Sequence, residues 1–196
     1  MVNVAIVEDN NTIRNGLKEF INDTTDYKCV AEFSNCESLL KSLPALQFDI
    51  LLMDIELPGI SGIEGIKEIK KISDNQKIII LTIYEESENL FEALATGACG
   101  YLEKKTPPSQ MLKVIGDIHL GRSYMNTYIA RKVLNHFTGR KREGLSKIEF
   151  DVLNSLTDGK SPKAISDFYE IPIESIHNHF FNIYRKLHHR FGLIKI

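Results

Sequence analysis

The run Asp49-Ile-Leu-Leu-Met-Asp54, followed at once by Ile55-Glu-Leu-Pro-Gly59, is the stretch that most constrains the fold. Four apolar residues between two acids are typical of a strand buried on both faces of a sheet. The Pro-Gly pair predicts that the chain turns directly after this strand. Asp54 should therefore lie at the carboxyl end of a strand in an α/β sheet, where such sheets bind ligands.

Three further strand-like runs also end in polar side chains. Glu8 and Asp9 follow the first run, Thr82 follows a run of isoleucine and leucine, and Lys104 follows a short run that begins at Gly100. In a parallel sheet the carboxyl ends of the strands share one edge. The sequence therefore predicts that acids, a hydroxyl and an amine gather at one rim.

These polar groups suit phosphoryl chemistry. Three neighbouring carboxylates repel one another unless a cation neutralises them, and Mg²⁺ binds carboxylates together with phosphate oxygens. An amine and a hydroxyl can hold the remaining oxygens of a phosphoryl group. We therefore expect phosphoryl transfer onto Asp54, with Mg²⁺ held by Glu8, Asp9 and Asp54, and with Thr82 and Lys104 on the phosphoryl oxygens.

The first 121 residues alternate between strand-like and helical patterns. The strand-like runs lie near residues 2–7, 28–33, 49–53, 77–82 and 99–102. The helical patterns lie near residues 11–23, 36–43, 62–72, 86–97 and 107–120. This alternation predicts a parallel sheet with helices on both faces, in a domain that spans residues 1–121.

After Gly121 the pattern becomes helical. A linker over residues 122–143 should contain a helix at 128–137, and the run Thr138–Gly144 is polar and basic. A second domain, all helical, should occupy residues 144–196. Within the linker, Arg140-Lys-Arg142 is more typical of a solvated segment than of a phosphate clamp.

The second domain has the signals of a helix-turn-helix. Ser146 and Glu149 match a capping box at the start of one helix, and Ser161-Pro162 is typical of the start of the next. The second helix should carry Ala164, Ile165 and Phe168 inward. A third helix from about Ser175 to His188 has one apolar stripe, which consists of Ile176, Phe180, Ile183, Tyr184 and Leu187. Two helices joined by a tight turn and followed by a helix with one buried face predict a helix-turn-helix.

Composition and charge narrow the class of protein. No apolar run approaches the roughly 20 residues of a membrane helix, no signal peptide is visible, and the three cysteines lack ligand spacing. We therefore expect a cytoplasmic protein without a membrane partner. Residues 1–121 hold 11 Lys and Arg against 19 Asp and Glu, whereas residues 122–143 hold 6 against 1 and residues 144–196 hold 7 against 6. This asymmetry favours a nucleic-acid partner for the second half.

The first domain resembles the receiver domain of two-component response regulators. The resemblance lies in Val7-Glu-Asp-Asn10, Met53-Asp-Ile-Glu-Leu-Pro58 with Gly62, Leu81-Thr82, and Gly97-Ala-Cys-Gly-Tyr-Leu-Glu-Lys104. It implies a five-stranded flavodoxin-like fold with strand order 2-1-3-4-5. It also implies that Asp54 accepts a phosphoryl group from a sensor histidine kinase, and that the protein catalyses only this transfer and the loss of the group.

The same resemblance assigns roles around Asp54. Asp9 would bind Mg²⁺ with Glu8 close by, and the backbone carbonyl of Glu56 would complete the metal site. Thr82 and Lys104 would hold the phosphoryl oxygens, and Tyr101 would be the switching aromatic residue. Phosphorylation would then bring two copies of the chain together as a homodimer.

The second domain resembles the helix-turn-helix of the LuxR/NarL/FixJ family. The matching pieces are Leu145-Ser-Lys-Ile-Glu-Phe-Asp-Val-Leu153, Gly159-Lys-Ser, Lys163 to Ile165, and Ser175-Ile-His-Asn-His-Phe-Phe-Asn-Ile-Tyr-Arg-Lys-Leu187. The resemblance implies transcription regulation by DNA binding. The residues expected at DNA are Lys163, His177, Asn178, Phe181, Arg185 and Lys186.

Several positions depart from that family. His177 replaces a usual lysine, Phe181 stands where a basic or polar residue is common, and Pro162 replaces a usual asparagine. The family's fourth helix should follow Leu187, but the remaining residues lack a convincing helical repeat. Two interpretations therefore stay open: a DNA-binding regulator, or a regulator whose second domain is a protein-interaction module with Phe181 as its apolar anchor.

Overall fold

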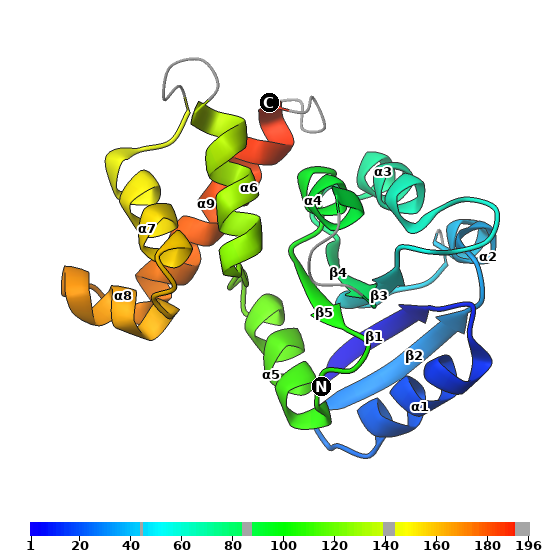
Figure 1. Ribbon diagram of the computed structural model, residues 1–196. Helices are drawn as coiled ribbons and strands as arrows, with labels where there is room; N and C mark the ends of the chain where they lie inside the picture. Colours follow the sequence, from blue (N-terminus) through cyan, green and yellow to red (C-terminus); the bar gives the residue numbers. More distant parts are fainter. Residues whose placement is uncertain (44, 84–87, 139–143, 191–196) are drawn as a thin grey trace.

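The computed structural model describes residues 1–43, 45–83, 88–138 and 144–190 (Figure 1). The N-terminal domain contains a five-stranded sheet with strand order β2-β1-β3-β4-β5, in which every pairing is parallel. The strands are β1 (Val2–Val7), β2 (Tyr27–Phe33), β3 (Ile50–Asp54), β4 (Lys77–Thr82) and β5 (Gly100–Glu103). This order confirms the predicted flavodoxin-like fold.

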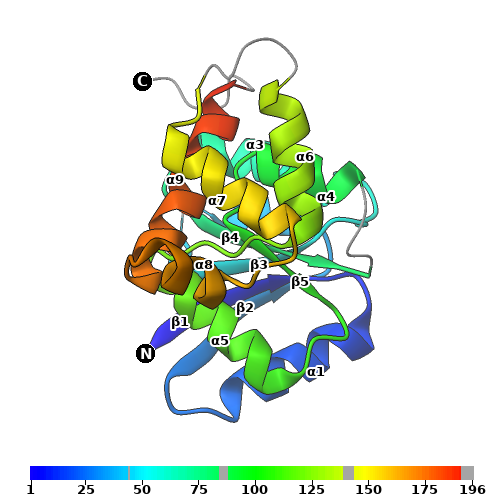
Figure 2. The same ribbon diagram turned by 60° about the vertical axis from the view of Figure 1, so that its left-hand side comes forward.

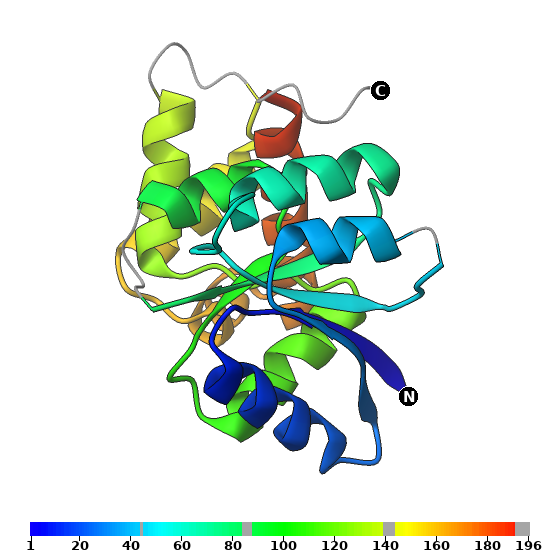
Figure 3. The same ribbon diagram turned by 90° about the vertical axis from the view of Figure 1, so that its right-hand side faces the viewer.

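Helices cover both faces of this sheet (Figures 1 and 3). They are α1 (Asn11–Asn22), α2 (Cys36–Ser42), α3 (Gly62–Ile72), α4 (Glu88–Ala95) and α5 (Pro108–His119). The apolar residues of α1 and α5 pack on one face, against alternate strand residues such as Ile50 and Leu52. Those of α2, α3 and α4 pack on the other face, against Leu51 and Met53. Because β3 is covered on both faces, all five of its residues are buried, and its continuous apolar run is explained.

The turn after β3 depends on a glycine. A Cβ atom on Gly62 would lie 2.0 Å from the backbone oxygen of Asp54, a distance that no side chain can tolerate. The backbone N–H of Gly62 donates to the carbonyl of Ile55 at 3.0 Å, so the loop folds back on the strand end. Helix α3 then begins with a capping box between Ser61 and Glu64. The start of α3 therefore packs directly against the backbone of Asp54.

The C-terminal half is helical in the part of the chain that the structure describes. Its helices are α6 (Thr127–Thr138), α7 (Lys147–Thr157), α8 (Pro162–Tyr169) and α9 (Ile173–Arg190). The predicted capping box of Ser146 and Glu149 is present, and Ser161 caps α8. The apolar stripe predicted for the third helix is buried, and consists of Ile176, Phe180, Ile183, Tyr184 and Leu187. Helix α9 continues beyond Leu187, the point after which a separate fourth helix was considered, and ends at Arg190.

One packing prediction in this half is wrong. Phe168 and Ala164 of α8 were expected to point inward, but Ala164 is exposed and 64% of Phe168 is accessible to solvent. Only Ile165 of the three is buried. The ring of Phe168 instead packs edge-on against Tyr169 at 4.9 Å and lies 4.2 Å from the Lys160 ammonium. A helix of two turns has too narrow a buried stripe to cover all three positions.

The two halves pack against each other. Helix α6 packs on α7, and α9 runs close to α4 of the receiver-like domain (Figures 1 and 2). One apolar cluster is continuous across both halves, since it contains residues of β3 and α4 as well as residues of α6 and α9. The predicted basic run Arg140-Lys-Arg142 lies outside the described residues. No helix in the described ranges is long and apolar enough to span a bilayer.

Candidate functional site

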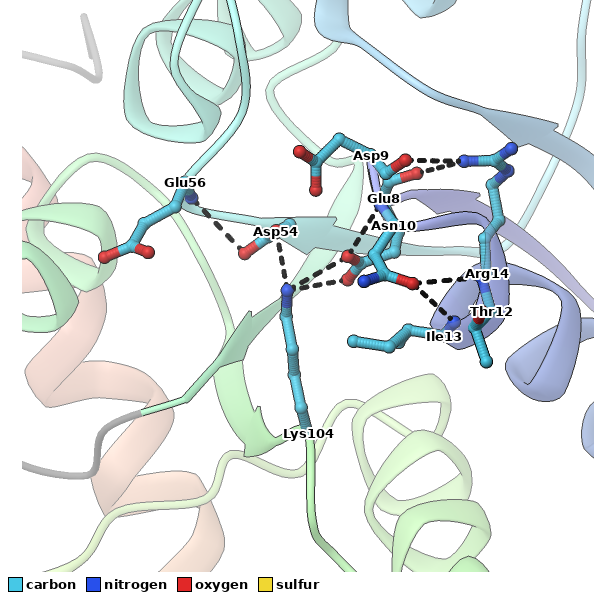
Figure 4. Close-up of polar contacts among 9 residues, drawn as sticks. All are labelled: Glu8, Asp9, Asn10, Thr12, Ile13, Arg14, Asp54, Glu56 and Lys104. Atoms are coloured by element: carbon cyan, nitrogen blue, oxygen red, sulfur yellow. Dashed lines mark hydrogen bonds and ion pairs between the residues drawn. The ribbon is translucent and has the colours of Figure 1, made fainter.

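Three carboxylates meet at the carboxyl edge of the sheet (Figure 4). Asp54 is the last residue of β3 and is 2% exposed, and Glu8 follows β1 and is fully buried. Asp9, next in the chain, is exposed. One oxygen of each residue lies within 4.8 Å of the others. The sheet topology has therefore brought together acids that stand 45 positions apart in the sequence.

Lys104 bridges the two buried acids. Its Nζ lies 2.7 Å from Asp54 Oδ2 and 2.8 Å from Glu8 Oε2, and it donates to Glu8 Oε1 at 3.1 Å. The lysine follows β5, whose neighbour in the sheet is β4. Its backbone N–H donates to the carbonyl of Thr82 at 2.8 Å, which fixes the point where the side chain leaves the sheet. The ammonium thus lies within hydrogen-bonding distance of the carboxylate that is expected to accept the phosphoryl group.

Burial sets the electrostatics of this cluster. Desolvation raises the pKa of Asp54 and of Glu8 above their ordinary values, and the ammonium of Lys104 opposes this rise only in part. Burial alone would lower the pKa of Lys104, but its hydrogen bonds to Asp54 and Glu8 outweigh that effect, and the pKa is raised. The lysine therefore stays charged, but its single positive charge does not fully compensate the cost of burying the two carboxylates.

The donor set fits a hard cation. Glu8 Oε2 is buried and makes no hydrogen bond of acceptable geometry, so this oxygen can still bind a cation although it lies 2.8 Å from the Lys104 ammonium. Glu8, Asp9 and Asp54 offer oxygen ligands only, which is the preference of Mg²⁺. Glu56, whose carbonyl was expected to complete the set, lies beside the cluster, since its backbone N–H donates to Asp54 Oδ1 at 3.3 Å.

Arg14 is a residue of this site that the sequence did not reveal. Its Nη1 donates to the backbone carbonyl of Glu8 at 2.6 Å and to that of Asp9 at 3.3 Å (Figure 4). The Asn10 side chain accepts from the backbone N–H groups of Thr12 and Ile13 and caps α1. The loop that carries both acids is therefore held from two directions. Nothing in the spacing of a single arginine on the first turn of a helix could have indicated this.

The other two residues expected at the phosphoryl group lie on β4 and β5. Thr82 ends β4 and is buried, and Tyr101 of β5 is buried with its ring turned toward the second half of the molecule. The ring of Tyr101 packs at 5.4 Å against that of Tyr124 in the linker. The hydroxyl of Tyr184, on α9, donates to the carbonyl of Tyr124 at 2.9 Å. Contacts therefore run from β5 through the linker to α9.

The residues expected at DNA fall into two groups. Asn178, Phe181 and Arg185 are exposed on α9, whereas His177 is half-buried and its ring nitrogen donates to the carbonyl of Ser123 at 3.1 Å. The Arg185 guanidinium lies 6.0 Å from the ring of Phe181. Both of these side chains line a cavity that is also lined by residues of the receiver-like domain and of the linker. Phe181 and Arg185, two of the residues of α9 expected at DNA, therefore lie beside the first half of the molecule.

The two lysines in the set are engaged by acids of their own domain. Lys186 lies 2.5 Å from the buried Glu149. Burial would raise the pKa of Glu149, but hydrogen bonds from Lys186 and Ser146 outweigh it and lower the pKa. Lys163 pairs with Asp167 one helical turn away, and both side chains are exposed. Lys186 thus holds α9 to α7, a role that its sequence position did not indicate.

His188 joins α9 to α4 through a hydrogen bond. It is buried, and its Nε2 donates to the carbonyl of Leu94 at 2.7 Å. Desolvation lowers the pKa of His188 to about 4, although the hydrogen bond to Leu94 opposes the shift. At neutral pH the imidazole is therefore neutral. This contact was also not predicted, because the partner group is a backbone carbonyl 94 positions away.

Comparisons with known proteins identify both halves. Residues 4–116 match the response regulator receiver domain, and residues 143–193 match the bacterial regulatory proteins of the luxR family. Response regulator UvrY of Escherichia coli O6:H1 is 29% identical over 192 residues, which cover 95% of this chain and 88% of UvrY. Transcriptional regulatory protein LiaR of Bacillus subtilis is 28% identical over 192 residues, which cover 95% of this chain and 91% of LiaR. The RcsB response regulator, solved in a DNA complex, shares the fold with a TM-score of 0.60 at 22% identity, and the match covers 99% of each chain.

Proposed function

The chain belongs to the response regulators that join a receiver domain to a LuxR-type helix-turn-helix domain, and from this premise we propose that phosphorylation of Asp54 controls its binding to DNA. The observation that carries the proposal is the buried contact of the Lys104 ammonium with Asp54 and Glu8. The expected donor is the phosphohistidine of a sensor kinase, and the expected compartment is the cytoplasm.

The residues at the sheet edge have distinct tasks in this reaction. An Asp54 oxygen forms the new bond to phosphorus as the bond between phosphorus and the kinase histidine breaks. Mg²⁺, when held by Glu8, Asp9, Asp54 and the Glu56 carbonyl, supplies positive charge against both the acids and the phosphoryl oxygens. Lys104, already 2.7 Å from Asp54, is placed to move its hydrogen bond onto a phosphoryl oxygen. Thr82 is the expected second donor.

The modification acts on the second half through the contacts between domains. In the unphosphorylated structure, Phe181 and Arg185 line a cavity beside the receiver, although both side chains are partly exposed, and we infer that the receiver hinders the approach of a duplex to this part of α9. We infer that phosphorylation draws Thr82 and Tyr101 toward the phosphoryl group, loosens the packing of Tyr101 on Tyr124, and so frees α9. The freed domain binds DNA, and two copies joined through their receivers bind more tightly than one.

A matched pair of variants tests the phosphoacceptor. Acetyl phosphate with Mg²⁺ should modify the wild type and leave Asp54→Ala unmodified, as scored by mass spectrometry of the intact protein. Asp49→Asn is the control, because Asp49 flanks the opposite end of the same strand and accepts from Asn3 N at 2.8 Å. It should be modified like the wild type. Equal modification of Asp54→Ala and wild type would refute the assignment.

A protein-interaction role for the second domain is the alternative. It is favoured by the engagement of Lys163 and Lys186 with Asp167 and Glu149, which leaves fewer cations for phosphates. Under this alternative Phe181, 40% exposed, anchors a protein partner. Gel shifts of phosphorylated protein at two salt concentrations separate the two roles, because only DNA binding weakens steeply with salt.

A further inference from the structure

A cavity of about 570 Å³ lies between the receiver and α9. Sites for small molecules commonly have volumes of roughly 300 to 1,000 Å³. Its receiver wall includes Lys77, the first residue of β4, and Cys99, which precedes β5. The cavity therefore opens at the amino ends of these strands, the edge of the sheet opposite Asp54, and is separate from the phosphorylation site.

The charged residues of the lining are mostly cationic. Lys70, Lys77, Arg122 and Arg185 line the cavity, against a single acid, Asp74. Lys70 donates to the backbone carbonyl of Asp74 at 2.6 Å, and Lys77 donates to the backbone carbonyl of His119 at 2.6 Å. Among the described residues, no carboxylate oxygen lies within 4.0 Å of the Lys70 or Lys77 ammonium or of the Arg185 guanidinium. Three cationic residues of the lining therefore have no ion-pair partner in the part of the chain that the structure describes.

The remaining lining is largely apolar. Ile118 and Cys99 contribute from the receiver, and Phe181 and Tyr184 contribute from α9. Phe181 is one of the few large apolar side chains that are exposed in the described part of the chain. A site of this kind combines a surface for a ring or short alkyl chain with cations at its margin. A purely hydrophilic anion would leave the apolar wall bare, and an uncharged apolar molecule would leave the cations unused.

We propose that this cavity binds a small organic anion with an apolar body, of the class of aromatic or aliphatic carboxylates, sulfonates and phosphate monoesters. Because Phe181 and Arg185 come from one domain and Lys70 and Lys77 from the other, only the closed arrangement offers the complete site. The ligand therefore stabilises that arrangement, by about 100-fold in the closed-to-open ratio at a concentration 100 times its Kd. This consequence for DNA binding rests on the function proposed above, whereas the binding itself does not.

The test uses the fluorescent anion 8-anilinonaphthalene-1-sulfonate as the probe and the full chain as the protein. We expect saturable binding of one probe per chain. The double substitution Lys77→Ala with Arg185→Ala should weaken binding of the probe by about 100-fold or more, because each charge-assisted contact contributes roughly 1.5 to 3 kcal/mol, equivalent to at least about 10-fold in Kd. The charge-matched control is Lys113→Ala with Lys147→Ala, two exposed lysines outside the lining, and its Kd should stay within twofold of wild type.

A second variant tests the cavity itself. Cys99→Trp adds bulk within the lining without altering charge, and should abolish probe binding while the far-ultraviolet circular dichroism spectrum stays native. Probe binding that does not saturate, or that weakens equally in the two double variants, would overturn the site whatever Cys99→Trp does.

Release of the bound probe on phosphorylation tests whether the cavity is linked to regulation. Acetyl phosphate should release bound probe from the wild type but not from Asp54→Ala, whose modification is scored separately by intact mass. If Asp54 is phosphorylated and the probe is retained with the same Kd, the regulatory half of the inference is wrong, while the proposed phosphoacceptor stands. If Asp54 is not phosphorylated, the proposed function fails, and the site is judged on the variants alone.

Discussion

The residues at the rim of the sheet and the residues of α9 expected at DNA were both predicted from sequence motifs, yet the structure places the two sets differently. At the rim, Glu8, Asp9, Asp54 and Lys104 converge within hydrogen-bonding or metal-binding range. On α9, the expected DNA contacts are divided among a domain-domain cavity, an ion pair and open solvent. Strand ends are placed by sheet topology, whereas the availability of a helix face depends on what packs against it.

The difference matters for function because only one of the two regions is ready to act. The side chains of the rim already lie within reach of one another, and under the proposed function they require only a cation and a phosphoryl donor. Under the proposed function, the face of α9 separates from the receiver before it binds DNA. The receiver thus provides a preorganised site, and the second domain provides a conditional one.

The largest expected effect comes from breaking the link between the two regions. Lys104→Ala removes a contact that differs between the phosphorylated and unphosphorylated states. The variant protein should therefore still be partly phosphorylated, but phosphorylation should no longer increase its affinity for DNA. For wild type that gain should be roughly 5- to 150-fold, the usual range of coupling between sites. Gel shifts before and after acetyl phosphate treatment measure it. The neighbouring Lys105→Ala is the control, since Lys105 is exposed and paired with Glu103.

An acid-driven opening of the closed form should be the next largest effect. The closed form holds the pKa of His188 at about 4, below its ordinary 6.5. The open form therefore binds the proton more readily, and the closed form loses stability as pH falls through 6.5, with no further loss below about 4. From pH 7.5 to 5.5 the opening equilibrium should rise by up to about 10-fold. Lys70 and Asp74 are the charged groups nearest this imidazole, and their effects oppose each other.

Small-angle scattering across this pH range measures the opening, and His188→Gln should flatten the profile. Glutamine keeps a donor for the Leu94 carbonyl but does not titrate. A profile identical in wild type and His188→Gln would assign any opening to other groups.

A smaller effect should distinguish Arg185 from its neighbours. In the phosphorylated protein Arg185→Ala should weaken DNA binding several-fold for every sequence and reduce the salt slope by about one unit, as expected for a phosphate contact. Phe181→Ala should instead change the preference among sequences, since a ring reads shape or a thymine methyl. Equal binding of all fragments by wild type and both variants would favour the interaction-module alternative.

The smallest effects concern the two engaged lysines. Lys186→Ala leaves Glu149 buried without its cation and should lower the free energy of unfolding by about 1 to 2 kcal/mol, a value reduced because Lys186 is partly exposed. Lys163→Ala breaks an exposed pair one turn apart and should cost only about 0.3 to 0.5 kcal/mol. Urea denaturation measures both. Equal losses would mean that Glu149 does not depend on Lys186.

The sequence predicted the fold and most of the rim because each signal was local. An apolar run that ends in an acid marks both the strand and the position of Asp54, and parallel strands then fix which ends meet. Tyr124 and His188 were not predicted because each contacts a ring or a backbone carbonyl far away in sequence, and Arg14 was not predicted because its partners are backbone carbonyls, which carry no sequence signal. Phe168 was misplaced because helical periodicity identifies a face but does not show how much of it a neighbour covers.

The central claim is that phosphorylation of Asp54 separates α9 from the receiver, and Cys99 reports on it directly. This thiol lines the cavity between the two, whereas Cys29, on β2, is not part of that lining and serves as an internal control. Alkylation rates of both cysteines can be followed by peptide mass spectrometry with and without acetyl phosphate. The account predicts that phosphorylation accelerates alkylation of Cys99 in wild type but not in Asp54→Ala, with Cys29 unchanged in both. A Cys99 rate that stays the same in fully phosphorylated wild type would contradict it.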